Sequence, residues 1–387
     1  MLNLMNKNHF DTIIIGAGVA GSAAAYHLAA KKRVLVLEQF EFLHRLGSSH
    51  GGSRIFRHAY DEPRYVRLAT AADALWETLE HDTGDKLLYR TGGLDVGNSD
   101  FAEIRGVQAA LDAAERPFEV LSPRETAARF PAFRLPEDNV AVFQADAGIL
   151  AATRCVNAML RLAAARGAEL RDREPVHTLE LREDRVVLTT AHGVYEADKL
   201  VVTAGAWLGR LLSGLELPLH VEQQQVIYAR VAAPSVFTPE RMPLFINHDP
   251  AATVYGFPLF DHPTAIKVSD HAGAPTITLE ERRTELMAER AANTLERARS
   301  FLPEVTDSLV HFELCLYTKT PDEHFILDRH PEVPNVVVGG GFSGHGFKFG
   351  PVIGEILADL ALEGRSAHDL SLFGLERFAP PTAAARA

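Results

Sequence analysis

Cysteine is nearly absent from this chain, since Cys155 and Cys315 are the only two in 387 residues. Two cysteines cannot build a disulfide framework, and their scarcity is typical of a reducing compartment. The longest apolar runs, such as TIIIGAGVAG, are too short and too interrupted by glycine to span a bilayer. The amino-terminal MLNLMNKNHFD has no apolar core with a cleavage site, and the carboxyl-terminal PPTAAARA is not a peroxisomal signal. We therefore expect a cytoplasmic protein.

Positive charge is also in short supply. The chain has 39 Lys and Arg residues against 51 Asp and Glu residues, which gives a net charge of −12 at pH 7. This balance argues against a surface for nucleic acid or for an anionic membrane. The sequence shows no internal repeat and no low-complexity segment. Its length is too great for one small core and predicts two domains.

What the sequence does contain begins with a nucleotide-binding pattern, FDTIIIGAGVAGSAAAYHLAAKKRVLVLEQ, over residues 10–39. In order, the pattern has a buried strand (12–15), the turn G-x-G-x-x-G at Gly16, Gly18 and Gly21, a helix (22–30), a second strand (33–37) and Glu38. The glycines permit a tight turn, close approach of a pyrophosphate and close packing of helix on strand. The helix amino terminus attracts phosphate, and a carboxylate at Glu38 accepts hydrogen bonds from ribose hydroxyls. The pattern predicts dinucleotide binding without distinguishing NAD from FAD.

The middle of the chain favours FAD. Residues 198–207, DKLVVTAGAW, are typical of a further buried strand, and residues 176–197 before it alternate like a meander of strands with polar turns. A nucleotide-binding unit interrupted by such a meander, with a further strand returning late in the chain, is the layout of a glutathione-reductase-like FAD domain.

A second glycine-rich segment, NVVVGGGFSGHGFKFGPVIGEILADLAL, spans residues 335–362. It again predicts a strand, a glycine loop and a helix, with Pro351 suited to the first helical turn. The helix amino terminus points at whatever the loop holds. For a flavin the useful target is the N1/C2=O edge, where negative charge grows on reduction. Lys348 lies in this loop between Phe347 and Phe349, which favours a buried role over that of a solvated loop lysine.

At this point the chain resembles a known family, the monomeric sarcosine oxidases and N-methyltryptophan oxidases among the D-amino-acid-oxidase-like flavoenzymes. The resemblance covers nearly the whole chain. It is carried by the motifs IIIGAGVAGSAAAYHLA, SSHGGSRIFRHAY, LVVTAGAW, VYGFP, LCLYTKTPDEHFILDRHP and GGGFSGHGFKFGP. The last two motifs are the most specific, because members of the wider family share only the first.

The resemblance implies roles for individual residues. Cys315 matches the cysteine that joins FAD by a thioether, and Lys267 matches a lysine at the site of oxygen reduction. The substrate carboxylate is expected at Arg57 and Lys348, with Tyr317 as a further substrate contact. The remaining catalytic residues implied are Arg54 and His50 beside the flavin, and Tyr255 and His271 on the amine side. The cofactor-binding residues implied are Gly16, Gly18, Gly21, Glu38, Val176, Cys315, Gly344, His345, Gly346, Phe347 and Lys348, and no metal is expected.

Two local patterns can be judged from the residues themselves. Cys155 follows a helical pattern in AATRCVNAML and is expected to be a buried, inert thiol. For Cys315, the adjoining Tyr317, Thr318 and Lys319 match the family as well, so the resemblance implies that this cysteine is the covalent tether. Arg54 and Arg57 are three residues apart and could share a helical face. In a chain of net charge −12, a buried pair of cations needs an anion, which a flavin and an amino-acid carboxylate supply.

We therefore predict an α/β (α+β) fold in which a Rossmann FAD-binding domain is interleaved with a mixed-sheet substrate domain. Residues 1–85, 145–218 and 312–387 form the first domain, and residues 86–144 and 219–311 form the second, with an amphipathic helical stretch over 278–303.

The predicted activity is oxidation of small N-methyl amino acids such as sarcosine by a monomer that uses oxygen as acceptor. The alternatives are a cyclic imino acid (pipecolate or proline), N-methyltryptophan, or a flavoprotein that passes electrons to a partner. Ile246, Asn247 and His248 lie where the family varies its substrate gate, which leaves substrate size open.

Overall fold

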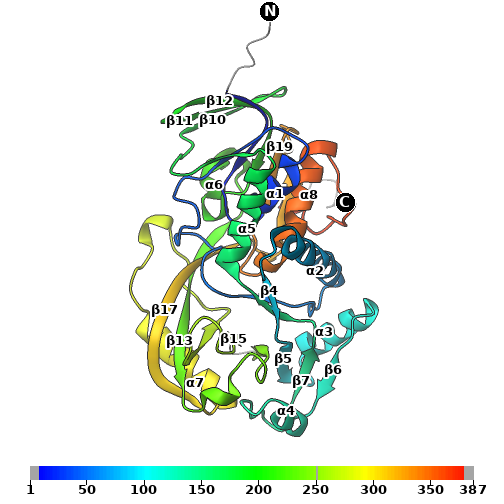
Figure 1. The fold of residues 1–387 in the computed structure, drawn as a ribbon, viewed down its shortest axis with the longest axis vertical. Helices are drawn as coiled ribbons and strands as arrows, with labels where there is room; N and C mark the ends of the chain where they lie inside the picture. Colours follow the sequence, from blue (N-terminus) through cyan, green and yellow to red (C-terminus); the bar gives the residue numbers. More distant parts are fainter. Residues whose placement is uncertain (1–7, 250–251, 379–387) are drawn as a thin grey trace, which may run out of the picture.

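The computed structural model describes residues 8–249 and 252–378 and is built around two large sheets, each of eight strands. Figure 1 shows the first sheet with helices packed on it in the upper half of the molecule and the second sheet in the lower half. The two terminal segments used to predict localisation lie mostly or wholly outside the described residues. Within the described part of the chain, no helix is both long enough and apolar enough to cross a membrane.

The first sheet has a parallel core in the order β9–β2–β1–β12–β19 and antiparallel strands at its margins. Its strands are β1 (His9–Ile15), β2 (Val34–Leu37), β9 (Glu169–Arg171), β10 (Thr178–Leu181), β11 (Val186–Thr190), β12 (Gly193–Val202), β18 (Ile326–Arg329) and β19 (Val336–Gly340). Successive side chains of a strand alternate between faces, so Ile14 packs in one apolar cluster while Ile13 and Ile15 pack in another. Both faces are covered, which explains the near-continuous apolar sequence. The predicted meander is the antiparallel run β10–β11–β12.

One face of the first sheet carries α1 (Val19–Ala29), α5 (Ala152–Ala165) and α8 (Gly350–Glu363). A further helix, α2 (Pro63–Thr83), packs against α5 and α8. α1 and α8 approach closely because Gly354 has no side chain, and a Cβ there would lie 2.4 Å from Ala23. α5 buries Cys155 in this core, so the inert thiol predicted at that position is consistent with its surroundings.

The second sheet has the order β17–β13–β16–β15–β14–β5–β7–β6. Its strands are β5 (Gly93–Asn98), β6 (Glu119–Leu121), β7 (Asn139–Gln144), β13 (His220–Val231), β14 (Leu244–His248), β15 (Val254–Phe257), β16 (Ala265–Asp270) and β17 (Val305–Lys319). The helices beside it are α3 (Ala102–Ala113), α4 (Pro123–Arg129) and α7 (Ala288–Phe301). β14 pairs with β5 in parallel and with β15 in antiparallel fashion, so the sheet is mixed, as predicted.

A small third sheet joins β3 (Arg54–Phe56), β8 (Gly148–Leu150) and β4 (Leu88–Arg90). Arg54 therefore lies in a strand, and the prediction that Arg54 and Arg57 share a helical face is wrong. The predicted division into domains stays a prediction. Residues 312–319, which it places with the FAD-binding segments, belong to β17 and pair with β13 in the second sheet.

The helical stretch predicted over 278–303 is shorter than expected. The structure has a single 3-10 turn (Leu279–Glu281) and then α7 from Ala288. Between them the buried Gln223 and Gln225 of β13 exchange hydrogen bonds with the backbone of Arg283 and Met287 respectively. These tertiary bonds replace the intrahelical bonds that the sequence pattern favours.

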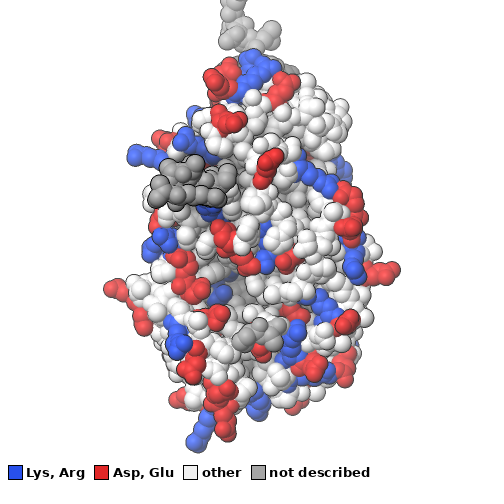
Figure 2. All heavy atoms as spheres, turned by 180° about the vertical axis from the view of Figure 1, so that it is seen from behind, with Lys and Arg blue, Asp and Glu red and all other residues white. Residues whose placement is uncertain are grey.

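The charged side chains are mixed in sign on the face of the molecule seen in Figure 2. Figure 2 shows Lys and Arg residues interspersed with Asp and Glu residues over the whole visible face. The cations that form a local cluster lie in the interior instead, around the cavity described next.

Candidate active site

A cavity of about 890 Å³ extends from the glycine turn after β1 to strands β15, β16 and β17 of the second sheet. All but one of the predicted site residues line it. They are Gly16, Gly18, Glu38, His50, Arg54, Arg57, Val176, Tyr255, Lys267, His271, Cys315, Tyr317, Gly344, His345, Gly346, Phe347 and Lys348. Gly21 does not line the cavity. It lies in the first turn of α1, where a Cβ would come 1.8 Å from the carbonyl oxygen of Gly16, so its role is close packing.

The glycine turn has the geometry that a nucleotide requires. Gly16 has φ +96°, a conformation that favours glycine, and a Cβ there would lie 2.4 Å from the carbonyl oxygen of Thr203. Gly18 caps α1 at its amino terminus, which faces the cavity. Glu38 ends β2 as predicted, and its carboxylate accepts hydrogen bonds from the backbone N–H of Ala17 (2.9 Å) and Phe40 (3.1 Å). Burial raises the pKa of Glu38, but His44 and these N–H groups outweigh it, so the net pKa is lowered and the group is anionic.

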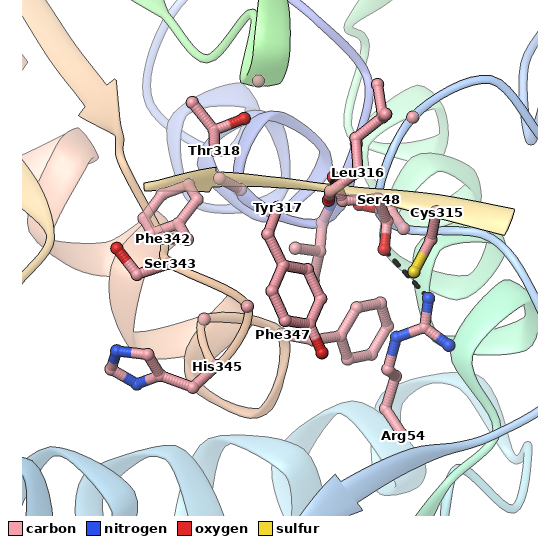
Figure 3. A pocket seen from close by; sticks show the side chains of 18 of the residues that line it. Ser48, Arg54, Cys315, Leu316, Tyr317, Thr318, Phe342, Ser343, His345 and Phe347 are labelled. Carbon is pink, nitrogen blue, oxygen red and sulfur yellow. Dashed lines mark hydrogen bonds between the residues drawn. The ribbon is translucent and has the colours of Figure 1, made fainter. Parts of the chain in front are cut away.

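At the opposite end of the cavity, β17 presents alternate residues to different sides. Figure 3 shows Cys315 and Tyr317 on one side of the strand, toward Arg54 and Phe347, while Leu316 and Thr318 point to the other. Burial raises the pKa of the Cys315 thiol, whereas the positive charges of Arg54 and Lys267 act in the opposite direction. The thiol thus faces two cations that would stabilise a thiolate.

His50 and Arg54 form the basic pair predicted beside the flavin. The Arg54 guanidinium donates to the carbonyl oxygens of Ser48 (2.9 Å), His50 (2.6 Å) and Ser53 (2.8 Å), which fixes its position. Burial and the charge of Arg54 lower the pKa of His50 to about 4, so its ring is neutral. Among the residues that the structure describes, neither buried ring nitrogen of His50 has a hydrogen-bond partner. A buried polar group without a protein partner is available to hydrogen-bond a bound cofactor.

Lys267 in β16 has only 3% of its surface exposed. Its Nζ donates to the carbonyl oxygen (3.0 Å) and the hydroxyl (3.1 Å) of Ser53 and lies 3.8 Å from Asp261. Burial and the charge of Arg54 lower the pKa of Lys267 to about 8, while Asp261 and Glu313 oppose that shift. The ammonium therefore persists at neutral pH in a nearly dry site.

The two cations predicted for a substrate carboxylate have different partners. Lys348 Nζ donates to the hydroxyl of Tyr60 (2.7 Å) and the carbonyl oxygen of His345 (2.8 Å), and burial together with Arg57 lowers its pKa well below the usual range. Arg57 donates to the carbonyl oxygen of Ala59 and, at 3.1 Å, to the buried carboxylate of Asp95. Arg57 is thus already half of an internal ion pair, which the sequence reasoning missed.

Asp95 also binds His248 of β14, whose Nε2 lies 2.8 Å from the same Oδ1. A usable signal for Asp95 was present in the sequence, because an acid in the middle of the strand GLDVGN must be paired when it is buried. Tyr60, Ser53 and Asp261 were also missed, and no local pattern in the sequence distinguishes them.

The amine side predicted for the substrate is formed by Tyr255, His271 and Tyr317. The hydroxyls of Tyr255 and Tyr317 lie 3.5 Å apart, and the His271 ring centroid is 5.6 Å from that of Tyr317. Burial lowers the pKa of His271 to about 4, and Lys319, Arg57 and Lys348 act in the same direction while Glu323 opposes them. The imidazole is therefore neutral at pH 7.

A glycine turn for a dinucleotide and a buried cluster of cations, joined in one cavity between two sheets, define a FAD-dependent oxidoreductase. The family model described as "FAD dependent oxidoreductase" (DAO) matches residues 11–360. Within that class, the chain belongs to the family of the monomeric sarcosine oxidases and N-methyltryptophan oxidases.

The relatives match over almost their full length. The chain is 37% identical to "Monomeric sarcosine oxidase" of an Arthrobacter species (96% of this chain, 97% of the relative). It is 38% identical to "Peroxisomal sarcosine oxidase" of Homo sapiens (96% and 97%) and 34% identical to "N-methyl-L-tryptophan oxidase" of Salmonella newport (95% and 99%). Among solved structures, the amino acid oxidase NikD superposes with a TM-score of 0.84 at 28% identity and covers 95% of this chain and 97% of its own. The predicted family and fold class are confirmed.

Proposed function

We propose that this chain oxidises small N-methyl amino acids such as sarcosine. The products are an imine, which water hydrolyses to an amino acid and an aldehyde, and hydrogen peroxide formed from oxygen. The observation that carries this proposal is the shared cavity, which is lined by the buried cations Arg57 and Lys348 together with Cys315 and Lys267. The names of the sarcosine oxidase relatives support the substrate class.

The residues present fit FAD at both ends of the cavity. Gly16 and Gly18 would cradle the pyrophosphate, Glu38 would lie at the ribose, and the orphaned ring nitrogens of His50 would lie beside the flavin. Bound FAD supplies redox chemistry: it takes two electrons and a hydrogen from the amine carbon and passes electrons to oxygen. The chain's own residues position the substrate, supply the electrostatic field around it and control its protonation.

We further propose that Cys315 carries the flavin through a thioether. Acid precipitation of the wild type should leave the flavin in the pellet, and the protein mass should exceed the chain mass by one FAD less two hydrogens. Cys315→Ala should release its flavin on denaturation, whereas the matched control Cys155→Ala should retain it, because Cys155 lies in the core of α5. Flavin that washes out of the wild type with acid would contradict the tether.

The substrate would be held by its carboxylate. Lys348 offers a point charge and Arg57 offers the N–H groups that Asp95 and Ala59 leave available. The same cations disfavour the ammonium form of the substrate, because like charges lower its pKa. Tyr255, Tyr317 and the neutral His271 would surround the free amine and fix its carbon for reaction.

We expect a compact substrate because Ile246, branched and largely buried, lines the cavity. His248 is held by Asp95 and could add a polar contact for a longer substrate. The preferred substrate size is therefore tested with amines of different lengths. Oxygen as acceptor and a monomeric state belong to the same proposal, and the printed names "oxidase" and "Monomeric" of the relatives support them.

The deciding experiment offers sarcosine, N-methylalanine, N-methyltryptophan, pipecolate, proline and dimethylamine to the enzyme in air and without oxygen. Anaerobic bleaching of the flavin reports amine oxidation, and peroxide formed in air separates an oxidase from a dehydrogenase. We expect sarcosine to react fastest. Dimethylamine lacks the carboxylate and should lose about 2–5 kcal/mol of binding, the cost of removing one partner of a buried charge pair. If dimethylamine is turned over as fast as sarcosine, the proposed carboxylate-binding site is wrong. If N-methyltryptophan is turned over faster than sarcosine, the cavity does not favour a compact substrate.

A further inference from the structure

A continuous chain of polar groups leads from Lys267 to the protein surface. Lys267 Nζ donates to the hydroxyl of Ser53 at 3.1 Å, and that hydroxyl donates to Asp261 Oδ2 at 2.6 Å. The hydroxyl of Tyr228 lies 3.1 Å from the same Oδ2 and 3.4 Å from a carboxylate oxygen of Glu313. Glu313 in turn binds Arg45, whose side chain is 64% exposed. Every link is within hydrogen-bond reach.

The position of Asp261 suits exchange of protons with water. Its side chain is 11% exposed, whereas that of Lys267 is 4% exposed. Its Oδ2 receives hydrogen bonds from Ser53 and Tyr228 together, which hold the carboxylate in place. Ser53 is fully buried and lies between the two charged groups, so a proton moving between Asp261 and Lys267 has one hydroxyl to cross.

Peroxide formation at this site has a proton requirement. Reduction of oxygen follows O2 + 2e⁻ + 2H⁺ → H2O2, and bound FAD in its reduced, anionic form would supply both electrons but only one hydrogen. One further proton is needed, and in this nearly dry site the buried ammonium of Lys267 is a proton donor at hand. Lys267 can donate it, but the resulting neutral amine must then be reprotonated before the next turnover.

We infer that Asp261 and Ser53 form a proton relay that reprotonates Lys267 during oxygen reduction, an inference that rests on the proposed oxidase function. A proton from water first reaches the Asp261 carboxylate and then moves to the oxygen of Ser53, while the Ser53 hydroxyl hydrogen passes to Lys267 Nζ. Asp261 is left as the carboxylate that the structure shows. Asp261 acts through Ser53 and Lys267, so it is a positioning and relay residue and does not itself touch oxygen.

The charge of Lys267 depends on groups from several elements. Burial and the charge of Arg54 in β3 lower the proton affinity of Lys267, and Asp261 and Glu313 raise it. Cys315 of β17 faces it as well, and the rings of Phe257 and Tyr228 lie 5.2 Å and 6.0 Å from Nζ. Removing the Asp261 carboxylate therefore lowers the pKa of Lys267, and the ammonium is lost at a lower pH.

The test uses the flavin-loaded protein with Asp261→Asn, Ser53→Ala and Ser53→Thr. We expect Asp261→Asn and Ser53→Ala to slow flavin reoxidation by oxygen at least tenfold at pH 8 while anaerobic reduction by sarcosine changes less than twofold. Ser53→Thr keeps a hydroxyl and should restore most of the rate. The control Asp359→Asn removes a carboxylate that also accepts a serine hydroxyl, from Ser366 at 3.0 Å, but on α8 away from this cavity. It should behave as the wild type.

A second readout needs no turnover. In protein labelled with 13C-lysine, the Lys267 resonance, assigned by its loss in Lys267→Met, should titrate at lower pH in Asp261→Asn than in the wild type. The pH midpoint of reoxidation should move the same way. Unchanged reoxidation and titration in Asp261→Asn would overturn the relay, as would equal slowing of both half-reactions. If the wild type forms no peroxide with any amine, the proposed function fails, and the lysine titration still shows whether Asp261 is coupled to Lys267.

Discussion

Lys267 and Lys348 are both almost fully buried, and burial lowers the pKa of each ammonium group. Their neighbours differ. Carboxylates near Lys267 oppose the shift, so that its pKa stays at about 8. Arg57 adds to the shift at Lys348, and Asp95 opposes it without preventing a pKa well below the usual range. Lys267 therefore keeps its charge at neutral pH. At Lys348, an anion that binds nearby stabilises a charged form that the protein alone disfavours.

Binding of a carboxylate should draw a proton onto Lys348, because an adjacent anion raises the pKa of an ammonium group. We expect proton uptake when propionate, which has no amine, binds near neutral pH, and weaker binding as the pH rises. Calorimetry in buffers of different ionisation enthalpy measures the uptake directly. Lys348→Met should abolish the uptake and cost about 2–5 kcal/mol of binding. Equal proton uptake by Lys348→Met would assign the titration to another group.

Lys267→Met should affect oxygen far more than the amine. A cation held beside developing negative charge is worth about 3 kcal/mol, by analogy with the donors of an oxyanion hole, so reoxidation should slow by at least two orders of magnitude. Reduction by sarcosine without oxygen should remain near the wild-type rate. Stopped-flow absorbance of the flavin separates the two half-reactions, and equal damage to both would make Lys267 a structural residue.

At the scale of elements, the sequence predicted what is local. The glycine turn, the first two strands and the meander follow from periodicity and turn residues, and the structure has them. The sequence did not predict the contacts between segments that are distant along the chain. The pair of Arg57 and Asp95 and the bridge from Tyr228 to Glu313 join residues 38 and 85 positions apart, and nothing in one segment specifies the partner in the other.

The stretch before α7 shows how such contacts override propensity. Gln225 of β13 accepts from the N–H of Met287 (2.6 Å) and donates to its carbonyl oxygen (3.1 Å). Gln225→Ala should leave these backbone groups unpaired and cost about 1–3 kcal/mol of unfolding free energy. Urea unfolding measures the loss. Gln108→Ala in α3, which lies outside this contact, should change stability by less than about 0.5 kcal/mol. A similar loss in both variants would show that the pairing at Met287 is not the cause.

At the scale of the whole molecule, the cavity joins the two large sheets. Its lining includes the turn after β1 in the first sheet and strands β13, β15, β16 and β17 in the second. A ligand that fills it contacts both halves, so its binding free energy adds to the stability of both. A covalent tether makes that contribution independent of free cofactor, whereas a reversible site makes it depend on concentration.

Cys315→Ala should therefore convert a fixed stability into a concentration-dependent one. A ligand that binds only the folded state stabilises it by RT ln(1 + [L]/Kd), about 2.7 kcal/mol at one hundred times Kd. We expect the melting temperature of Cys315→Ala to rise with added FAD and that of the wild type to stay constant. Cys155→Ala is the matched control, because it loses a buried thiol from α5 and should melt lower than the wild type at every FAD concentration. If the melting temperature of Cys315→Ala does not change with added FAD, either the variant does not bind the cofactor or the cavity does not couple the two sheets. Flavin fluorescence titration of the folded variant distinguishes these outcomes, since binding without stabilisation contradicts the coupling.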